Sequence, residues 1–234
     1  DSENRNNNDM SINIKGRTVY GPNIITDGLV LYLDAGNTKS YPRSGTTCYD
    51  LSNNKYVDTM TDVIYDSSYN GCMIFNGTSS TTTIPVSIPP LEQITVNLWH
   101  YTSLDTKCAL VSCFNSVYFH NSTALFYLIG SDGTTSGYIM DSKPPHGQWN
   151  MLTGTWDGSV MKFYINSVKV PTEVNFYGGT YNVIRGFSSI SCGYYFNSTQ
   201  PWTHGKIPLL QIYTKALTQS EITQNYNALK SRYL

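Results

Sequence analysis

The spacing of the acidic residues indicates whether this protein could hydrolyse glycosidic bonds. That chemistry needs two acidic side chains flanking the bond, one as the acid and the other as the nucleophile or base. No glutamate has an acidic residue two positions away within a predicted strand; the glutamates are Glu3, Glu92, Glu173 and Glu221. The sequence therefore predicts a protein that is not an enzyme.

Other patterns that carry reactive chemistry are also missing from the sequence. The four histidines lack the spacing of a metal-binding pair; they are His100, His120, His146 and His204. The sequence contains no GxSxG nucleophile motif, no phosphate-binding loop and no dinucleotide-binding fingerprint. We expect the protein to act by binding rather than by catalysis.

Three aspartates are the candidate metal ligands. Asp34, Asp50 and Asp157 fall at the ends of predicted strands, where hard oxygen ligands could converge on a calcium ion. The alternative is that each one caps a turn, because no dense Asp/Asn loop surrounds them. For Asp157 this alternative is favoured, since Gly158 follows it and accepts the positive φ of a short hairpin turn. Calcium is the one cofactor that the sequence leaves open.

Aromatic residues in loops are the candidates for ligand binding. Tyr177 and Tyr181 bracket two glycines, and Trp202 and His204 lie beside Pro201. An aromatic face stacked on a sugar ring would make a carbohydrate platform, with Asn, Ser and Tyr side chains supplying hydrogen bonds. The alternative is that these residues pack against the terminal helix or a neighbouring subunit, since large aromatics dominate interfaces.

The composition narrows the class of partner. Charged residues make up only 13% of the chain and the formal net charge is −1, so no basic field is present to hold nucleic acid. Nineteen tyrosines suit contact with neutral sugars or other subunits, or else reflect the high β-propensity of Tyr. No apolar run is long enough for a membrane span. Five cysteines without a CxxC spacing are expected to be buried free thiols.

Residues 1–26 are predicted to form a polar N-terminal arm, and residues 27–234 a single domain. Residues 1–9 contain no apolar side chain, so they cannot bury themselves. We expect a partner subunit to hold the arm, which implies an oligomer or a larger assembly.

From Gly28 onward the sequence is typical of β-structure. Residues 149–166 alternate with period two on both sides of an Asp-Gly-Ser turn, which predicts strand, turn, strand. The segments ALFYLIG and SGYIM flank a second hairpin turn. The gaps between such segments leave no room for helices, so we expect antiparallel sheets.

One helix is expected, at the C-terminal end. Thr218 and Glu221 form a T-x-x-E capping box, and Leu217 and Ile222 can close a hydrophobic staple around it. An apolar stripe follows that should pack on a sheet; it comprises Ile222, Tyr226, Leu229 and Tyr233.

Several motifs occur in an order that resembles a laminin G-like, concanavalin A-like domain. They are GLVLYLDAGN at 28–37, FNG at 75–77, ITVNLWHY at 94–101, the 149–166 hairpin, and GKIPLLQIYTKALTQSEITQNYNA at 205–228. The resemblance implies an all-β fold, a two-sheet antiparallel jelly-roll sandwich with a short C-terminal helix. It also implies that the two tryptophans of the hairpin, Trp149 and Trp156, fill the layer between the sheets. Family members are typically binding modules for glycans or protein surfaces, sometimes through calcium at the rim.

The segment GLVLYLDAGNTKSYPRSGTTCYDLS also resembles the sequences of this domain in bacteriophage and other viral structural proteins. We therefore expect a non-enzymatic virion protein, such as a capsid decoration, tail or fibre component, that binds host-surface glycans. Two alternatives stay open. One is a purely structural assembly subunit with protein partners, and the other is a cell-surface carbohydrate-binding module of a longer extracellular protein.

Overall fold

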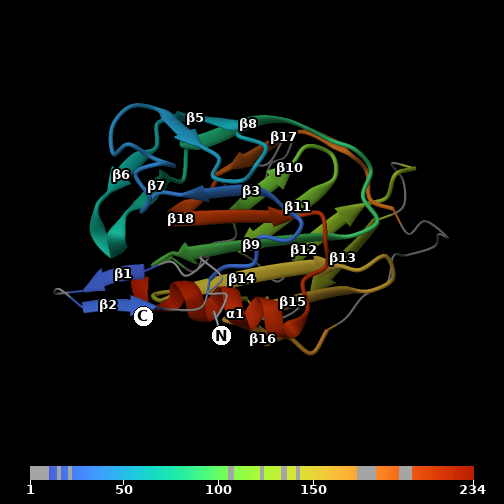
Figure 1. Cartoon of the computed structure of the whole chain (residues 1–234). Coiled ribbons are helices and arrows are strands. Elements are labelled where there is room, and N and C mark those ends of the chain that lie inside the picture. The colour runs from blue at the N-terminus through green and yellow to red at the C-terminus, as the bar shows by residue number, and fades with distance from the viewer. Residues whose placement is uncertain are drawn as a thin grey trace, which may run out of the picture.

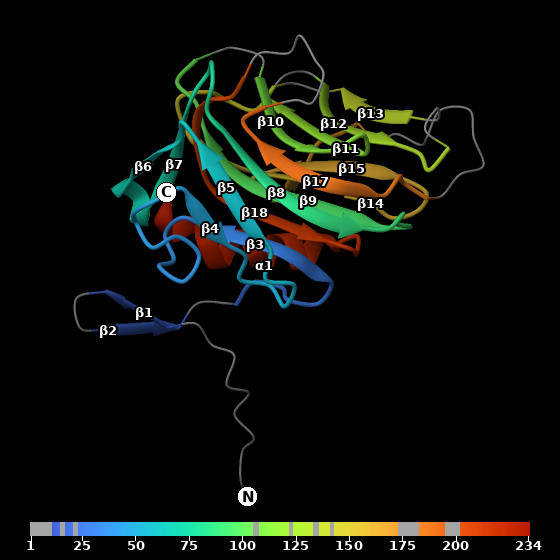
Figure 2. The ribbon, with the colours of Figure 1, turned by 90° about the horizontal axis from the view of Figure 1, so that it is seen from above.

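A computed structural model describes residues 11–14, 17–20, 23–104, 108–121, 124–132, 136–140, 143–172, 183–194 and 202–234. Two antiparallel sheets are stacked face to face in this part of the chain, and one helix lies outside them (Figure 1). Figure 2 shows the two sheets as separate layers with the helix beyond one of them. The predicted two-sheet antiparallel sandwich with a short C-terminal helix is confirmed.

One layer, here called the β8 sheet, has eight described strands. In spatial order they are β13 (Ser136–Met140), β12 (Ala124–Ile129), β11 (Val117–Asn121), β10 (Cys108–Cys113), β17 (Phe187–Cys192), β8 (Thr81–Ile88), β5 (Val57–Thr61) and β4 (Thr47–Tyr49).

The other layer, here called the β9 sheet, also has eight described strands. Seven lie in the order β16 (Val168–Lys169), β15 (Met161–Ile165), β14 (Trp149–Trp156), β9 (Ile94–Tyr101), β18 (His204–Tyr213), β7 (Cys72–Asn76) and β6 (Ile64–Asp66), and β3 (Leu29–Asp34) pairs with the second half of β18. Every described strand pair in both sheets is antiparallel, as the short gaps between the apolar segments predicted.

The main core lies between the two sheets, and period-two alternation fills it. In β9, Ile94, Val96 and Leu98 are fully buried and face this core. Gly154 in β14 shows how tight the layer is, because a Cβ there would lie 2.8 Å from ring atoms of Phe119 and Phe126. The packing therefore requires a residue without a side chain at this position.

The two tryptophans of the 149–166 hairpin lie in different layers. Trp156 is buried in the core between the sheets, whereas Trp149 is buried on the opposite face of β14, in the cluster beneath the helix. The prediction that both fill the layer between the sheets is therefore wrong for Trp149. The reason is geometric, since residues an odd number of positions apart on a strand face opposite sides.

Helix α1 (Gln219–Leu229) covers the outer face of the β9 sheet. Thr218 is its N-cap, and both hydrogen bonds of the predicted capping box with Glu221 are present. The apolar stripe reaches the sheet as predicted; its residues join one buried cluster with Trp99, Trp149 and Tyr213, although Tyr233 lies just past the short 3₁₀ turn η2 (Lys230–Arg232). No helix in the described part of the chain is long and apolar enough to cross a membrane.

Two different arrangements occur within the predicted arm. Strands β1 (Ser11–Ile14) and β2 (Arg17–Tyr20) pair with each other and form a sheet of their own. Residues 23–26 instead dock on the domain, because Asn225 accepts a hydrogen bond from the Ile25 amide and Gln224 donates one to the Asn23 carbonyl. The boundary at residue 26 stays a prediction, and these contacts tie its last residues to α1.

The outer face of the β8 sheet carries an aligned row of hydroxyl residues. Strand register places one such residue of each of seven strands in the row: Thr47, Thr59, Thr83, Ser191, Ser112, Tyr118 and Tyr127. The row is open to solvent over β5 and β8, but Ser112, Ser191 and Tyr118 are each at most 3% exposed. Cross-strand hydroxyl pairs of this kind stabilise register.

Candidate functional site

Five side chains at one end of the β9 sheet form the candidate site, here called the Tyr69 platform. It consists of Tyr69, Tyr101, Trp149, Lys206 and Asp66. Strand register places Lys206, Tyr101 and Trp149 in one row across β18, β9 and β14. Tyr69 comes from the 3₁₀ turn η1 (Ser68–Asn70), which joins β6 to β7 and brings its ring over this row.

Aromatic rings are the largest part of this surface. The Tyr69 ring meets Trp149 edge-on, with centroids 5.1 Å apart and planes at 70°. Tyr101 lies on Trp149 with centroids 5.4 Å apart. Trp149 is buried, but Tyr69 is 45% exposed. A rigid aromatic base thus presents one tyrosine ring to solvent.

A charged pair lies against the exposed ring. The Lys206 ammonium is 5.6 Å from the centroid of Tyr69 and 2.8 Å from Asp66 Oδ2. Asp66 Oδ1 accepts hydrogen bonds from the Ser68 amide at 2.8 Å and from the Ser68 hydroxyl at 2.6 Å. The hydrogen bond from Lys206 and the bonds from Ser68 hold the pKa of the Asp66 carboxyl below its usual range, and the same ion pair raises the pKa of Lys206.

The backbone of η1 is strained where it presents the ring. Tyr69 has φ 54° and Asn70 has φ 64°, in the left-handed region that L-residues avoid. Such a conformation costs about 1–2 kcal/mol for each residue. The turn is packed closely from behind, because a Cβ at Gly71 would lie 2.6 Å from the Ala35 carbonyl oxygen. Backbone strain of this kind is concentrated at functional sites.

This arrangement can do a specific kind of chemistry. A flat aromatic ring can stack on the apolar face of a sugar ring, and the neighbouring ammonium and carboxylate can donate to and accept from its hydroxyl groups. The groups are fixed before a ligand arrives, which reduces the entropy lost on binding.

The structure places two of the four sequence-predicted aromatic-site residues near this end of the sheet. Trp202 is half-buried and lies on Tyr194, with ring centroids 4.6 Å apart. His204 is exposed and begins β18, two residues before Lys206 and therefore on the same face. Tyr177 and Tyr181 lie outside the described residues. The ligand-binding role of these four residues stays a prediction.

The three predicted calcium ligands each have protein partners. Asp34 accepts two hydrogen bonds from the Arg232 guanidinium, at 2.7 and 2.8 Å. Asp50 is buried and accepts from the amides of Tyr32 and Ser52, each at 2.8 Å.

Asp157 holds its own turn, as the alternative interpretation proposed. Its Oδ1 accepts from the amides of Ser159 and Val160, and its Oδ2 pairs with Lys162 at 3.1 Å. Within the described ranges, no three acidic, histidine or cysteine residues are grouped so that they could hold a metal ion. Calcium binding stays a prediction from the sequence alone.

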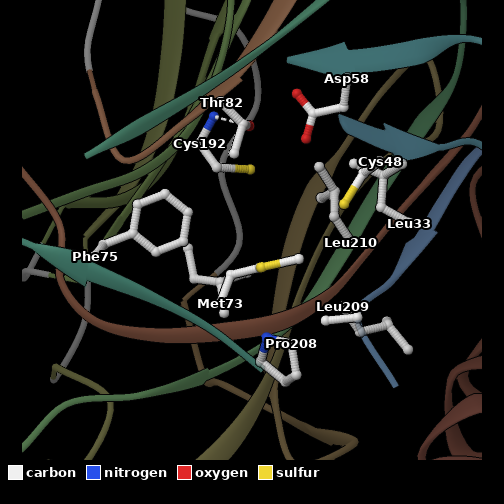
Figure 3. A pocket seen from close by; sticks show the side chains of 12 residues that line it. Leu33, Cys48, Asp58, Met73, Phe75, Thr82, Cys192, Pro208, Leu209 and Leu210 are labelled. Atoms are coloured by element: carbon white, nitrogen blue, oxygen red, sulfur yellow. Dashed lines mark hydrogen bonds between the residues drawn. The ribbon is translucent and has the colours of Figure 1, made fainter. Parts of the chain in front are cut away.

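One carboxyl with a perturbed pKa lies in the core rather than at a surface site. Asp58 is 1% exposed and lines a small cavity of about 30 Å³ between the sheets, together with Cys48 and Cys192 (Figure 3). Burial raises the pKa of Asp58 to about 7. The space is about that of a single water molecule, so it cannot admit a substrate.

The sequence also contains a signal for Tyr69. The prediction of Tyr177 and Tyr181 rests on nearby glycines that expose aromatic residues in loops. Tyr69 precedes Asn70-Gly71 and meets the same criterion. What the sequence could not show is that Trp149, Tyr101 and Lys206 lie beneath it, since these residues come together only through strand register.

Comparison with known families gives a match over most of the sandwich. A model of the concanavalin A-like lectin/glucanases superfamily matches residues 75–223. Among curated proteins, no sequence matches the chain.

Solved structures with similar folds include binding domains of botulinum neurotoxins. The binding domain of botulinum neurotoxin serotype G has a TM-score of 0.64 and 18% sequence identity, covering 85% of this chain and 50% of that one. The binding domain of botulinum neurotoxin DC in complex with SialylT has a TM-score of 0.67 and 15% identity, covering 88% and 52%. The serotype D ligand binding domain in complex with N-acetylneuraminic acid has a TM-score of 0.66 and 14% identity, covering 86% and 51%. The chain thus spans about half the length of these structures, and the likeness shows a shared fold.

Proposed function

The chain belongs to the concanavalin A-like lectin/glucanase superfamily, and from this premise we propose that it is a glycan-binding domain without catalytic activity. The observation that carries the proposal is the Tyr69 platform, where a strained and exposed tyrosine is held on a buried tryptophan beside an ion pair. Two structures of similar fold, at low identity, are complexes with SialylT and N-acetylneuraminic acid, which supports a saccharide as the ligand.

The absence of catalysis is part of the same proposal. Four of the described carboxylates, those of Asp34, Asp66, Asp157 and Glu221, are engaged in ion pairs, turns or the helix cap. Asp58 has a raised pKa, but it has no access to a substrate. No pair of carboxyl groups for glycoside hydrolysis is evident among these residues.

Removing the Tyr69 ring is the direct test. Tyr69→Ala should weaken glycan binding at least tenfold, which corresponds to about 1.4 kcal/mol, because the stacking surface is lost. Tyr69→Phe should bind nearly as well as the natural protein, because the ring stays. Binding is measured on a glycan array with the protein clustered on a multivalent carrier, since single sites of this kind are weak and linkage strengthens them.

The chain offers a matched control for this test. Tyr49 in β4 is 46% exposed, almost the same as Tyr69, but lies in the other sheet. Tyr49→Ala should leave binding unchanged. If Tyr49→Ala reduces binding and Tyr69→Ala does not, the platform is elsewhere. If a clustered preparation binds no glycan at all, the proposed function is wrong.

The wider setting belongs to this proposal as well. We propose that the domain lies on the surface of a virus particle, as a decoration, tail or fibre component. Two features support this: the sequence of residues 28–52 resembles viral structural proteins, and the N-terminal arm is polar. The runner-up is an assembly subunit whose partners are proteins only, and the paired strands β1 and β2, which form a sheet apart from the sandwich, favour it specifically. An extracellular or cell-surface module of a longer protein is the remaining alternative.

Deleting residues 1–20 tests the role of the arm. The deletion spares residues 23–26, which are hydrogen-bonded to α1, so the melting temperature should change by less than about 2 °C while assembly into oligomers or particles is lost. A longer deletion of residues 1–27 removes that docking and should lower the melting temperature. If the deletion of residues 1–20 already lowers the melting temperature strongly, the arm is part of the fold of the domain.

A further inference from the structure

A second concave surface lies at one end of the β8 sheet, where the neighbouring strands β10, β17 and β8 come together (Figure 2). This Arg185 pocket is an open depression of about 370 Å³, within the range of about 300–1,000 Å³ that is usual for small-molecule sites. It is formed by the end of β8, the turn between β10 and β11, and the residues at the start of β17.

The Arg185 pocket and the Tyr69 platform lie at opposite ends of the sandwich. Ile184, the neighbour of Arg185, pairs with Leu91, three residues before β9 begins. Tyr101 of the platform is the last residue of β9. A strand of this length spans more than about 20 Å, so one small ligand cannot contact both surfaces.

Backbone contacts hold the segment that carries Arg185 in place. The Arg185 amide donates to the Ile129 carbonyl at 2.9 Å, and the Arg185 carbonyl accepts from the Ser116 hydroxyl. A Cβ at Gly186 would lie 2.6 Å from the Ile88 carbonyl oxygen, so the start of β17 is packed directly on the end of β8. The backbone of the fold therefore sets the shape of the pocket.

Four polar residues that line the pocket make no hydrogen bond or ion pair through their side chains with the described residues: Arg185, Asn115, Ser87 and Ser188. Arg185 and the two serines are exposed, and Asn115 is half-buried. The turn holds Asn115 at φ 54°, a left-handed conformation that Asn adopts more readily than most other residues. These four side chains can therefore all bind a ligand without losing a contact within the fold.

The charge and the apolar surface of the pocket come from different residues. None of the described residues that line it carries a carboxylate, so the Arg185 guanidinium makes the pocket positive in a chain whose formal net charge is −1. Ile88 and Phe187 are buried and line it as well. The pocket thus combines one positive charge, uncharged polar groups and apolar surface, a mixture that is usual in sites for small molecules.

We infer that the Arg185 pocket binds the carboxylate-bearing unit of an acidic sugar, such as a uronic or sialic acid residue. The planar guanidinium of Arg185 donates two parallel hydrogen bonds to the carboxylate. Asn115 and Ser188 bind hydroxyl groups of the same sugar, and Phe187 contributes apolar contact. The inference rests on the proposed glycan-binding function and adds acidic sugars to its ligands at a site separate from the Tyr69 platform.

The test uses the full chain with N-acetylneuraminate, glucuronate and glucose as separate probes in NMR titrations. The two acids should shift the amide signals around Asn115 and Arg185, and glucose should shift them far less. Arg185→Gln should weaken binding of the acids at least tenfold, because the charge-assisted hydrogen bonds are lost. Arg185→Lys keeps the charge without the planar fork and should weaken binding severalfold. Arg43→Gln removes an exposed guanidinium outside the pocket and should leave binding unchanged.

A second variant and two further probes test the rest of the pocket. Asn115→Asp keeps a residue that tolerates the left-handed conformation but adds a negative charge, so it should weaken binding of the acids at least tenfold. Acetate and sulfate carry the charge without the sugar ring, and each should bind at least tenfold more weakly than glucuronate.

The outcomes separate this inference from the proposed function. Tyr69→Ala should leave titration of the acids at the pocket unchanged. If the acids bind Arg185→Gln and Asn115→Asp as tightly as the natural protein, the pocket is not the site. If acetate or sulfate binds as tightly as glucuronate, the pocket recognises an anion but no sugar, and the inference is wrong. If neither acid binds while the clustered protein still binds neutral glycans through Tyr69, the inference fails and the proposed function stands.

Discussion

Replacing Arg232 by methionine should lower the free energy of unfolding by about 3–5 kcal/mol. The Arg232 guanidinium meets Asp34 with two hydrogen bonds, at 2.7 and 2.8 Å, and the Asp34 side chain is only 5% exposed. Removing one partner of a buried ion pair leaves an unpaired charge in a poorly solvated place, and this accounts for the size of the effect. Urea unfolding at pH 7, followed by tryptophan fluorescence, gives the measurement.

Two further variants isolate the cause of this loss. Lys39→Met removes an exposed cation and should change stability by less than about 0.5 kcal/mol. The double variant Arg232→Met/Asp34→Asn removes both charges and should be more stable than Arg232→Met alone, because no unpaired charge remains. An Arg232→Met protein as stable as Lys39→Met would show that the pair is energetically unimportant.

The same ion pair also supports the Tyr69 platform from behind. A Cβ at Gly36 would overlap the Arg232 guanidinium and would lie 2.6 Å from the Asn70 carbonyl oxygen. Gly36 is therefore packed tightly between the Arg232 guanidinium, which pairs with Asp34, and the backbone of η1. Arg232→Met should for this reason also reduce glycan binding, even where most of the protein remains folded.

The sequence predicted the elements whose signals are local. The capping box of Thr218 and Glu221 is present as predicted, because both of its hydrogen bonds lie within one turn of the chain. The Asp157-Gly158 turn is also present, with φ 90° at Gly158. All five cysteines are buried free thiols, as the absence of a CxxC spacing indicated.

Some local signals conflicted with one another. Strand β8 alternates between buried and more exposed side chains along its length, but Pro85 in its middle argues against a strand. The structure resolves the conflict with a register shift opposite β17, between Phe187 and Ser189. A β-bulge accommodates a residue that has no amide hydrogen to donate.

The candidate sites depended on register and on long-range contacts, which no local pattern encodes. Asp34 was predicted as a metal ligand from its place at the end of a strand, and its partner proved to be Arg232, nearly the whole domain away in sequence. Likewise, Lys206, Tyr101 and Trp149 become neighbours only because β18, β9 and β14 pair in one particular register. Residue types were visible in the sequence, but their convergence was not.

The buried carboxyl of Asp58 should make the stability of this protein depend on pH. Its Oδ1 has no hydrogen-bond partner, and its environment is apolar apart from Thr82 and two thiols (Figure 3). Burial raises the pKa of Asp58 from 3.8 to about 7, against hydrogen bonds from Thr82, Thr83 and Thr59 that lower it. The thiols do not ionise in this range, since burial raises the pKa of Cys192 to about 12 and that of Cys48 further.

The sign of the effect follows from which state holds the proton. Between pH 4 and pH 7 the folded protein keeps the Asp58 proton and the unfolded chain releases it, so this group destabilises the fold as pH rises. The shift corresponds to about 4 kcal/mol. Buried His100 acts in the opposite direction, because burial lowers its pKa from 6.5 to about 3, so its contribution is lost as pH falls. Between about pH 4 and pH 6.5 the contributions of Asp58 and His100 to the free energy of unfolding have opposite signs. They partly cancel, so the pH dependence of the total stability shows neither of them alone.

The free energy of unfolding should be compared between the natural protein and Asp58→Asn. The contribution of His100 is the same in both proteins and cancels in this difference. We expect this difference to move by about 4 kcal/mol in favour of Asp58→Asn between pH 4 and pH 8, as measured by urea unfolding at each pH. Asp62→Asn is the matched control, because it alters an exposed carboxyl close to Asp58 in the sequence. Its free energy of unfolding should differ from that of the natural protein by less than about 0.5 kcal/mol at each pH. A pH-independent difference for Asp58→Asn would mean that the Asp58 carboxyl is ionised in the core at neutral pH without penalty. The most direct physical reason for such a result would be ordered water in the 30 Å³ cavity, hydrogen-bonded to the carboxylate oxygen that lacks a protein partner.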